Sequence, residues 1–374
     1  MQYIFILGNT PELSVLEIKS ILPDFSVLHE TEQIFMIETQ QDINAQELIK
    51  ILGGTVKIAL LIPPTPFSTF VETGEQRGLR TKFGFSFYSL DKSIGVSYLK
   101  NLKQKYRRKG LELKKELRAQ GKRAELIESQ DLALSSVIIA KEKCMDIIIL
   151  VDENKKEYYA KTLAVQPFRE FSHRDYDRPN KDMHAGMLPP KVARMMVNIS
   201  QGKKDEILLD PFCGSGTILQ EALLLGYQKV IGSDISAKAI KDSEANLKFL
   251  NLKNYKLLNI DAKNLKNMKI SMIITEVYLG PPNIIPQKLN NAINELLKLY
   301  QEVFLNLKKI LNKNANLVVA FPAWRFNNQI THLPITEILN KLGYKQKSQP
   351  IIYGRPDARV LREIYILNLT RPPA

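Results

Sequence analysis

The first 62 residues alternate between the period-two pattern of short strands and the wider spacing of amphipathic helices. The pattern predicts strands at 3–7, 26–29, 34–37 and 56–61, with helices that begin at Thr10 and after Asp42. This order, βαββαβ, is that of ferredoxin-like domains. Prolines at positions 63, 64 and 66 interrupt the pattern, and we expect a linker there.

A second α+β pattern occupies residues 67–165. Phenylalanines at alternate positions between 83 and 87 predict a strand, and a helical pattern extends from Gly95 to about Gln120. Further strands are predicted at 124–128, 146–151 and 158–165, with a helix over 134–141. We therefore expect a second small domain after the linker.

From residue 186 onward, buried strands alternate with helices, which is typical of an open α/β sheet. Strands are predicted at 207–210, 229–234, 257–262, 272–274 and 316–322, with a long amphipathic helix over 289–311. The segments 351–356 and 362–367 predict two further strands. The length of 374 residues is enough for two or three such domains.

The charge balance points to a polyanionic partner. A net charge of +14 favours nucleic acid over a membrane, although a lysine-rich proteome is an alternative explanation. Eleven basic residues but only two acids lie between Lys100 and Arg123, around Tyr106. Such a run is ordinarily a solvated helix face, whereas a high density of one sign favours phosphate contacts. The predicted RNA contacts are Lys105, Arg107, Arg108, Lys109, Lys122 and Arg123.

Cysteine usage and hydropathy constrain the setting of the protein. Cys144 and Cys213 are the only cysteines, so neither a disulfide framework nor a Cys-His zinc pattern is predicted. No apolar run is long enough to span a membrane, and the first residues lack the basic start of a signal peptide. We expect a cytoplasmic protein without a metal or a membrane contact.

The most informative stretch is an apolar strand pattern that ends in Asp210 and leads through a glycine turn into a helix. Gly214 and Gly216 let the backbone turn tightly and present amide groups to a ligand at the helix N-terminus. Asp210 would repel a pyrophosphate but attract an ammonium group, which S-adenosylmethionine carries. Leu219 occupies the place of the third glycine of the dinucleotide fingerprint, so NAD is disfavoured.

Two further acids follow the next strand patterns. Asp234 ends a strand at a spacing that suits acceptance of both ribose hydroxyls, and Asp261 suits the exocyclic amine of adenine. A solvated loop acid or a helix cap is the alternative for each, and Asp234 is placed to cap a helix from Ala237. A generic nucleotide-binding sheet is therefore the competing interpretation. The predicted cofactor contacts are Asp210, Phe212, Cys213, Gly214, Gly216, Thr217, Asp234, Ile235, Asp261 and Ala262.

The chain resembles the THUMP-domain RNA methyltransferases over nearly its whole length, and most closely the tRNA guanine-10 N2-methyltransferase family of archaea and eukaryotes. The resemblance lies in the order of units and in the segments 134–137, 161–166, 174–179, 186–198 and 210–217. It implies a ferredoxin-like domain at 1–62, a THUMP RNA-binding domain at 67–165, a linker at 166–185 and a Rossmann-like class I methyltransferase domain at 186–374. In such a domain the segments 351–356 and 362–367 would form the antiparallel pair that closes the sheet. It also implies S-adenosylmethionine as the methyl donor and tRNA as the partner.

The fourth strand of the last domain departs from the family pattern. The family normally ends this strand with Asp or Asn, two prolines and an aromatic residue, whereas here Thr275, Glu276 and Tyr278 precede Pro281 and Pro282. Guanine N2 is a poor nucleophile, so a site must accept its hydrogen bonds and hold the flipped base against an aromatic face. Glu276 suits the first task and Tyr278 the second. An ungapped register instead puts Leu279 in the place of the aromatic residue, and alignment of Tyr278 puts Thr275 in the place of the acid. The sequence does not choose between these registers.

These features together predict a methyltransferase that uses S-adenosylmethionine to form N2-methylguanosine in tRNA, with position 10 indicated by resemblance. Another tRNA or ribosomal guanosine is the nearest alternative. A protein that binds RNA but has lost catalysis is the alternative from another class, and DNA adenine methylation is disfavoured because no groove-reading element is recognisable. The number of methyl groups, the oligomeric state and the need for a small partner subunit stay open.

Overall fold

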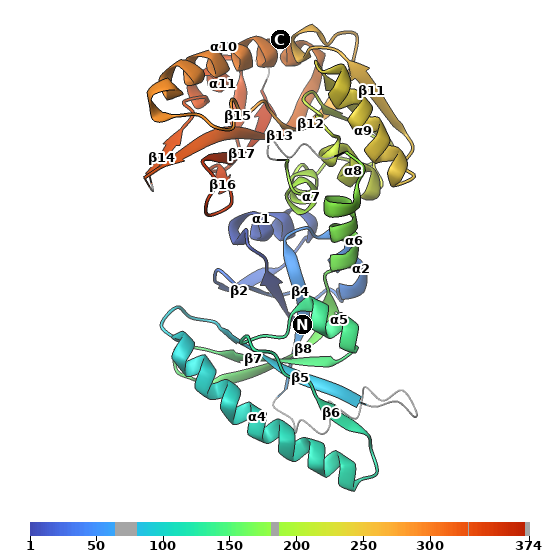
Figure 1. Ribbon diagram of the computed structural model, residues 1–374, viewed down its shortest axis with the longest axis vertical. Helices are drawn as coiled ribbons and strands as arrows, with labels where there is room; N and C mark the ends of the chain where they lie inside the picture. Colours follow the sequence, from blue (N-terminus) through green and yellow to red (C-terminus); the bar gives the residue numbers. More distant parts are fainter. Residues whose placement is uncertain (64–80, 181–186, 328, 371–374) are drawn as a thin grey trace. The chain divides into compact units, whose positions relative to one another are not determined.

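The computed structural model describes residues 1–63, 81–180, 187–327 and 329–370 (Figure 1). The chain forms two compact units, Met1–Glu170 and Phe171–Ala374. Pro64 and Pro66 of the predicted first linker, and the last residues of the predicted second linker, 181–185, lie outside the described residues. Among the described residues, no helix has the length and apolar character needed to cross a membrane.

The first unit opens with the predicted βαββαβ order. Its elements are β1 (Gln2–Leu7), α1 (Pro11–Ile21), β2 (Ser26–Glu30), β3 (Ile34–Glu38), α2 (Ala45–Ile51) and β4 (Thr55–Ile62). The strands lie in the antiparallel order β2-β3-β1-β4. Ile18 of α1 and Ile49 of α2 pack in one core cluster with Phe5 of β1, so both helices cover the same face of these strands.

The rest of the first unit continues the same sheet. Its elements are β5 (Thr81–Ser89), α4 (Val96–Ala119), β6 (Ala124–Leu126), α5 (Ser136–Glu142), β7 (Met145–Val151) and β8 (Glu157–Val165). Because β8 pairs antiparallel with β4, one eight-stranded sheet passes through both predicted N-terminal domains, in the order β2-β3-β1-β4-β8-β7-β5-β6. The local pattern of the sequence gives no sign of this pairing.

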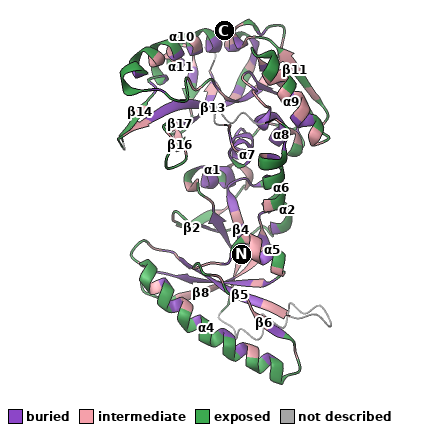
Figure 2. Cartoon of the chain, in the orientation of Figure 1, coloured by how far each residue is buried: buried purple, intermediate pink, exposed green. Residues whose placement is uncertain are grey.

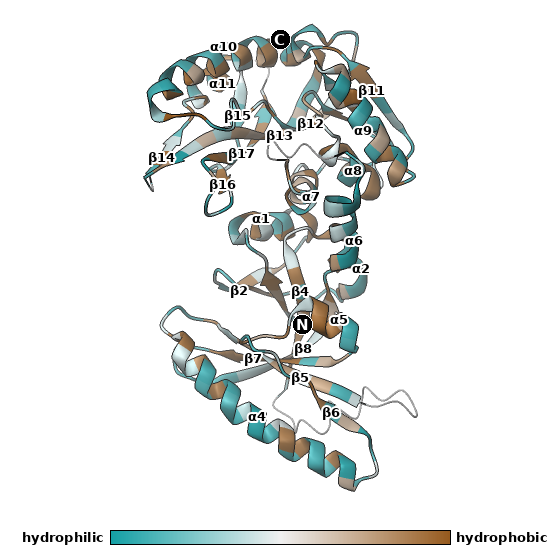
Figure 3. Cartoon of the chain, viewed as in Figure 1, coloured by the Kyte–Doolittle hydropathy of each residue, from teal (hydrophilic) through white to brown (hydrophobic). Residues whose placement is uncertain are grey.

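Helix α4 is amphipathic, as its sequence predicts. Leu99, Leu102, Leu113 and Leu117 are buried against the phenylalanines of β5, and most of the basic side chains lie on the exposed side (Figures 2 and 3). Tyr106 belongs to the buried side, where its ring contacts Phe85 and Phe87. This tyrosine is therefore a core residue, over whose ring Nζ of Lys105 and Nζ of Lys109 lie at 5.7 and 4.8 Å from the centroid.

The second unit contains the predicted α/β sheet. Its elements are the end of α6 (Phe168–Ser172), the short π-helix η1 (His173–Asp177), α7 (Pro190–Ile199), β9 (Ile207–Asp210), α8 (Thr217–Leu224), β10 (Lys229–Asp234), α9 (Ala237–Phe249), β11 (Tyr255–Asn259), the 3-10 turn η2 (Ala262–Asn264), β12 (Ile270–Glu276), α10 (Pro286–Ile310), β13 (Leu311–Phe326), β14 (Gln329–His332), α11 (Thr336–Lys341), β15 (Tyr344–Gln346), β16 (Ile351–Tyr353) and β17 (Val360–Leu369).

The sheet of the second unit has the strand order β11-β10-β9-β12-β13-β17-β15. Strands β11, β10, β9, β12 and β13 are parallel, and β17 is antiparallel to its neighbours β13, β15 and β16, as expected for the closing pair. Helix α10 packs its apolar side on one face of the sheet through Tyr300, Phe304 and Leu307. The carboxyl ends of the parallel strands therefore share one edge, which is where ligands bind in open α/β sheets.

The second unit begins earlier than the predicted domain boundary at residue 186. Arg174 and Arg178, both within the predicted linker, are buried against α8 through Glu221 and Thr217. These contacts fix η1 to the second unit. Residues 174–178 are consequently part of the fold of this unit, and the sequence shows no hydrophobic pattern that would have placed them there.

Candidate active site

The glycine turn between β9 and α8 has the strained backbone that its residues permit. Gly214 has a φ of 49° and Gly216 a φ of 83°, both in the left-handed region that favours glycine. A Cβ atom on Gly216 would lie 2.4 Å from Oγ of Ser243, so only glycine fits there. Helix α8 starts at the next residue, and no side chain caps its first turn. The turn therefore delivers an uncapped helix N-terminus to the edge of the sheet.

Asp210 is the buried end of β9, with 2 % of its surface exposed. Its Oδ1 accepts hydrogen bonds from the hydroxyl of Thr275 at 2.6 Å and from the amide of Phe212 at 3.1 Å. Burial raises the pKa of Asp210 to about 7, although these two bonds oppose the rise, and the nearby acids Asp234 and Glu276 add to it. A cation bound beside this carboxyl would favour its ionised form.

Asp234 ends β10 and holds the two loops beside it. Its Oδ2 accepts from the amide of Gly214 at 3.0 Å, and its Oδ1 accepts from the amide of Ser236 at 2.8 Å. Ser236, and not Asp234, caps helix α9, because its hydroxyl oxygen accepts from the amide of Ala239. The helix-cap alternative for Asp234 is therefore wrong.

Ile235 follows Asp234 and is unusually exposed for its type. Its exposed fraction is 72 %, although it lies directly after a buried strand. The side-chain amide of Asn259 donates to the carbonyl oxygens of Asp234 and Ile235 at 3.0 and 2.9 Å, which fixes the loop. The structure thus holds an apolar side chain in solvent at the ligand edge of the sheet, as a flat apolar group of a ligand would require.

Asp261 lies beyond the end of its strand, because β11 ends at Asn259. Its Oδ1 accepts from the amide of Lys263 and caps the turn η2. Ala262 is buried, and its carbonyl oxygen accepts from the side-chain amide of Asn306 on α10 at 3.0 Å. The helix-cap alternative therefore describes the present contact of Asp261, and the loop that carries it is anchored to the neighbouring helix.

A cavity of about 120 Å³ lies at the glycine turn. It is lined by Met187, Leu188, Asp210, Phe212, Cys213, Gly214, Ser215, Thr217, Ile218 and Glu276. The lining thus brings together five predicted cofactor contacts with one predicted catalytic residue. The other predicted cofactor contacts lie outside the lining, at Gly216 and along the ends of β10 and β11.

The three predicted catalytic residues have different positions. Glu276 ends β12, lines the cavity, and accepts a hydrogen bond at Oε1 from Nε of Arg362 on β17. Burial raises the pKa of Glu276, and the charge and hydrogen bond of Arg362 oppose that rise. Thr275 is buried in the core and donates to Asp210, so its side chain is engaged beneath the cavity. Tyr278 has an exposed side chain, and its carbonyl oxygen accepts from the hydroxyl of Tyr300.

Sequence reasoning missed six residues at this site. Four of them line the cavity, namely Met187, Leu188, Ser215 and Ile218. Arg178 donates from Nη1 to Oγ1 of Thr217 at 2.8 Å, and Arg362 holds Glu276. The only available signal was the position of Arg178, Met187, Leu188 and Ser215 in segments that carry the family resemblance. Arg362 gave no signal, because its partner is 86 residues away in the sequence.

The basic residues of the first unit differ in how far they are already paired. Nζ of Lys105 lies 2.7 Å from Oε1 of Glu157, and Nε of Arg107 lies 2.8 Å from Oε1 of Glu128. Arg108, Lys109 and Arg123 are exposed, Lys122 is half-buried, and Nζ of Lys109 lies 4.8 Å from the ring centroid of Tyr106. Arg108 and Lys109 are therefore the neighbouring pair on α4 with the most accessible charge.

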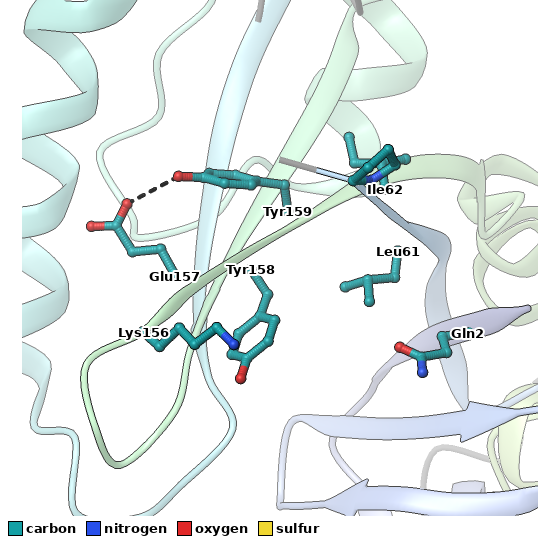
Figure 4. Close-up of a pocket in the computed structure, with 8 residues that line it drawn as sticks. Gln2, Leu61, Ile62, Lys156, Glu157, Tyr158 and Tyr159 are labelled. Carbon is teal, nitrogen blue, oxygen red and sulfur yellow. Dashed lines mark hydrogen bonds between the residues drawn. The ribbon is translucent and has the colours of Figure 1, made fainter. Parts of the chain in front are cut away.

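A larger cavity, of about 380 Å³, lies in the first unit between β1, β4 and β8 (Figure 4). Tyr158 and Tyr159 contribute to its lining, together with Glu157. Glu157 accepts from Lys105, Tyr106 and Tyr159, so its carboxylate serves the structure of this unit. In spite of its size, this cavity lacks the glycine turn and the strand-end acids of the smaller one. Over the described ranges, no group of three or more His, Cys, Asp or Glu side chains is placed to hold a metal ion.

The strand order of the second unit, with a glycine turn after the first central strand and acids at the neighbouring strand ends, defines a Rossmann-like methyltransferase fold. Residues 178–333 match the family described as RMKL-like, methyltransferase domain. Residues 26–245, more than half of the chain, match the family described as DNA methylase, and the chain belongs to this family.

Curated relatives carry names that refer to tRNA. The chain is 31 % identical over 186 residues to the tRNA (guanine(10)-N2)-dimethyltransferase of Methanocaldococcus jannaschii, a match that covers 47 % of this chain and 50 % of the relative. It is 32 % identical over 183 residues to the enzyme of the same name from Methanothermobacter thermautotrophicus, covering 48 % and 52 %. The chain thus spans about half the length of the curated relatives it matches.

Solved structures share the fold at low sequence identity. TrmN from Thermus thermophilus superposes with a TM-score of 0.56 and 14 % identity over 99 % of this chain and 100 % of that one. SMU.472, a putative methyltransferase complexed with SAH, superposes with a TM-score of 0.51 and 12 % identity over 100 % of this chain and 99 % of that one. At this level of identity, the structural similarity shows the fold alone. The chemistry has to be argued from the residues of the site.

Proposed function

We propose that the second unit transfers a methyl group from S-adenosylmethionine to RNA, and that the acceptor is the exocyclic N2 amine of a guanosine in tRNA. The main support is the cavity in which Asp210, the glycine turn and Glu276 meet at the carboxyl edge of the parallel strands. The curated relatives add support for the acceptor, because their names specify position 10 of tRNA. Position 10 is accordingly the site that we propose.

The residues at the sheet edge suit the parts of the methyl donor. Asp210 is a buried acid for the ammonium group, and the carboxylate of Asp234 keeps lone pairs for ribose hydroxyls besides the two backbone amides that it accepts. Ile235 offers an exposed apolar surface to the adenine ring, with Ala262 on the neighbouring loop. Asp261 offers an acceptor for the adenine amine. The donor supplies an electrophilic methyl group on a sulfonium centre.

Glu276 and Tyr278 are the residues of this chain proposed to act on the acceptor base. Glu276 accepts a hydrogen bond from the amine N–H and orients the nitrogen lone pair, a task that needs the ionised carboxylate. The charge and hydrogen bond of Arg362 favour this ionised form and oppose the effect of burial on the pKa of Glu276. Tyr278 presents an exposed ring on which a flipped base stacks. Thr275 acts indirectly, since its hydroxyl orients Asp210.

The first unit is proposed to hold the RNA. Helix α4 presents Arg108 and Lys109 to solvent on a face that carries few acids. Cations on such a face contact phosphates without regard to base sequence, and they position a folded RNA. The ferredoxin-like and THUMP organisation implied by the family resemblance is part of this proposal.

DNA is the second candidate acceptor, because the matching family is described as DNA methylase. The test is transfer of labelled methyl by the full chain to an unmodified tRNA transcript, to the same transcript with inosine at position 10, and to duplex DNA. Inosine lacks the N2 amine but keeps the rest of the base. We expect label only on the guanosine transcript. Equal label on both transcripts excludes N2 of position 10, and label on DNA alone rejects RNA.

The Glu276→Gln variant tests the active site in the same assay, with Glu295→Gln on the exposed side of α10 as the matched control. We expect Glu276→Gln to lose most of the turnover while binding of S-adenosylmethionine is retained. If the wild-type protein binds both donor and tRNA but transfers no methyl group at any pH tested, the result supports the alternative of an RNA-binding protein that has lost catalysis.

A further inference from the structure

The hairpin of β16 and β17 projects from the sheet of the second unit at its carboxyl edge (Figure 1). Strand β13 continues past Ala320, the partner of Glu276 in the sheet. Its neighbour β17 is antiparallel and begins at Val360, opposite Trp324. The connecting residues 354–359 therefore stand beyond the level at which β12 ends, on the side where ligands bind in open α/β sheets.

Tyr353 connects this loop to the candidate active site. It lies opposite Arg362 in the pairing of β16 with β17, so the two side chains share one face of the hairpin. Arg362 in turn donates to Glu276. Burial raises the pKa of Tyr353, and the charges of Arg362 and Arg355 oppose this rise. The charges of Asp175 and Glu276 add to the rise. The half-buried ring is therefore a neighbour of both the loop and the acid that lines the cavity.

Arg325, near the end of β13, braces the loop. Its main-chain amide donates to the carbonyl oxygen of Arg359 at 2.8 Å. Nη1 of its side chain donates to the carbonyl oxygens of Arg355 and Pro356 at 3.1 and 2.7 Å. These bonds engage backbone oxygens of the loop, and the side chains of Arg355 and Arg359 are exposed. The loop backbone is thus fixed before a ligand binds, which lowers the entropic cost of binding.

The use of arginine here departs from the composition of the second unit. Lysines are more than twice as frequent as arginines in this unit, yet residues 348–370 contain no lysine. Their cations are Arg355, Arg359 and Arg362, and the acid within the loop is Asp357. A lysine-rich composition therefore does not explain these positions. A guanidinium group presents a planar fork of donors that matches phosphate oxygens, which an ammonium group lacks.

We propose that Arg355 and Arg359 bind a backbone phosphate next to the target nucleotide of the RNA and so position that nucleotide at Glu276. The inference rests on the proposed function, because it takes RNA as the substrate of this site. A base that leaves the stack to enter the cavity brings its flanking phosphates to the edge of the sheet. The acids at the ends of β9, β10 and β12 repel these phosphates, whereas the loop arginines attract them. Arg325 is a positioning residue, since it fixes the loop backbone.

The test introduces one neutral methylphosphonate linkage on either side of the methylated guanosine, position 10 in the proposal, in a ligated tRNA. The nucleotide 5′ of the linkage is 2′-deoxy, because a 2′-hydroxyl would cleave it, and the control RNA carries the same deoxy nucleotide with an ordinary phosphate. Methyl transfer by the full chain gives kcat/KM for each RNA. The neutral linkage at the contacted phosphate should lower kcat/KM of the wild type by roughly tenfold or more, because a charge-assisted pair is lost. In Arg355→Met with Arg359→Met, the modified and control RNAs should react alike.

Lys269→Met with Lys313→Met is the matched control, because it removes two exposed cations at the amino ends of β12 and β13, the opposite edge of the same sheet. It should keep the full effect of the neutral linkage. Arg355→Lys with Arg359→Lys, which keeps the charges but loses the planar forks, should keep only part of the effect. A wild type that is indifferent to both linkages overturns the inference and leaves the proposed function intact. An effect that persists unchanged in Arg355→Met with Arg359→Met does the same. If the wild type transfers no methyl group to any of these RNAs, the proposed function itself is overturned.

Discussion

Arg362 of β17 donates a hydrogen bond from Nε to Oε1 of Glu276, the last residue of β12. The two strands are separated in the sheet by β13. Arg362 thus places a cation beside Glu276, which lines one cavity together with another acid, Asp210. Two carboxyl groups in one buried site resist being ionised at the same time. A fixed cation beside one of them lowers the pKa of that group relative to the other. Arg362 therefore opposes the rise that burial causes in the pKa of Glu276, whereas the pKa of Asp210, raised to about 7, would fall beside a bound cation.

The first prediction concerns the pH dependence of methyl transfer in Arg362→Met. Burial raises the pKa of Glu276 and Arg362 opposes the rise, so removal of the guanidinium raises the pKa of Glu276 further. The ionised carboxylate then forms only at higher pH, and the acidic limb of the rate profile should move upward by roughly one pH unit or more. Transfer is measured with labelled donor from pH 5.5 to 9.5.

Arg362→Lys is the matched control, because it keeps the positive charge and should leave the acidic limb closer to that of the wild type. A loss of rate that is the same at every pH in Arg362→Met would contradict this role and indicate a purely structural one.

The second prediction concerns stability and Asp210. Its pKa in the folded protein is raised to about 7, above the value in the unfolded chain, so the protonated form is favoured by folding. This contribution is fully present below about pH 4 and declines on the order of 1 kcal/mol per pH unit until it is lost as the pH passes about 7. Asp210→Asn cannot ionise and should therefore lose less stability between pH 5 and pH 7.5. Urea unfolding at both pH values measures the difference.

Parallel pH dependence in the wild type and Asp210→Asn would show that Asp210 titrates at its ordinary pKa. S-adenosylhomocysteine carries the same ammonium group as the proposed donor. At pH 7.5 it should reduce the difference in stability loss between the wild type and Asp210→Asn. The reason is that a bound cation favours ionised Asp210 but gains nothing from the amide.

Much of this fold could be predicted from the sequence, because short contiguous segments determine its strands, turns and helices. The strand that ends at Asp210, the glycine turn and the helix that follows occur in one continuous stretch, and the bounds of β9 and β10 are the predicted 207–210 and 229–234. Gly216 is an example. Its φ lies in the left-handed region, and a Cβ atom at this position would collide with Ser243, so the position requires glycine. Such constraints are visible one segment at a time.

The remaining features depend on contacts between distant segments. Thr217 receives a hydrogen bond from a residue 39 positions away, Glu221 from residues 47 and 27 positions away, and Glu276 from one 86 positions away. No period or turn residue encodes these pairs, so the ambiguity between Thr275 and Glu276 and the true start of the second unit had no local solution. The pairing of β4 with β8 is of the same kind.

The third prediction concerns the basic face of α4. Arg107 is paired with Glu128, whereas Arg108 and Lys109 are exposed. Arg108→Ala with Lys109→Ala should weaken tRNA binding and reduce the slope of log K against log salt by roughly 0.7 to 0.9 for each phosphate contact that is lost. Lys50→Ala on α2, which removes one exposed cation from the same unit, is the control and should leave the slope unchanged. Equal slopes for the double variant and the wild type would reject α4 as a phosphate-binding face.

The fourth prediction concerns Glu221, whose carboxylate accepts from both Arg174 and Arg194. All three side chains are buried, and both guanidinium groups stack against the ring of Phe171, at 4.4 and 5.3 Å from its centroid. Removal of the carboxylate leaves two cations buried beside each other. Glu221→Gln, which keeps the shape, should therefore lower the free energy of unfolding of the second unit by about 3–5 kcal/mol.

The same variant tests whether residues 171–178 belong to the fold of the second unit. If they do, Glu221→Gln should increase amide hydrogen exchange over residues 171–178 together with that of α8, because the ion cluster is what joins them. Glu244→Gln on the neighbouring helix α9, whose partner Lys248 is exposed, is the control and should change stability by less than about 1 kcal/mol. Faster exchange in α8 alone would contradict this role of the ion cluster. Residues 171–178 would then be held by apolar contacts, chiefly those of Phe171, and the arginines would only neutralise the charge of Glu221.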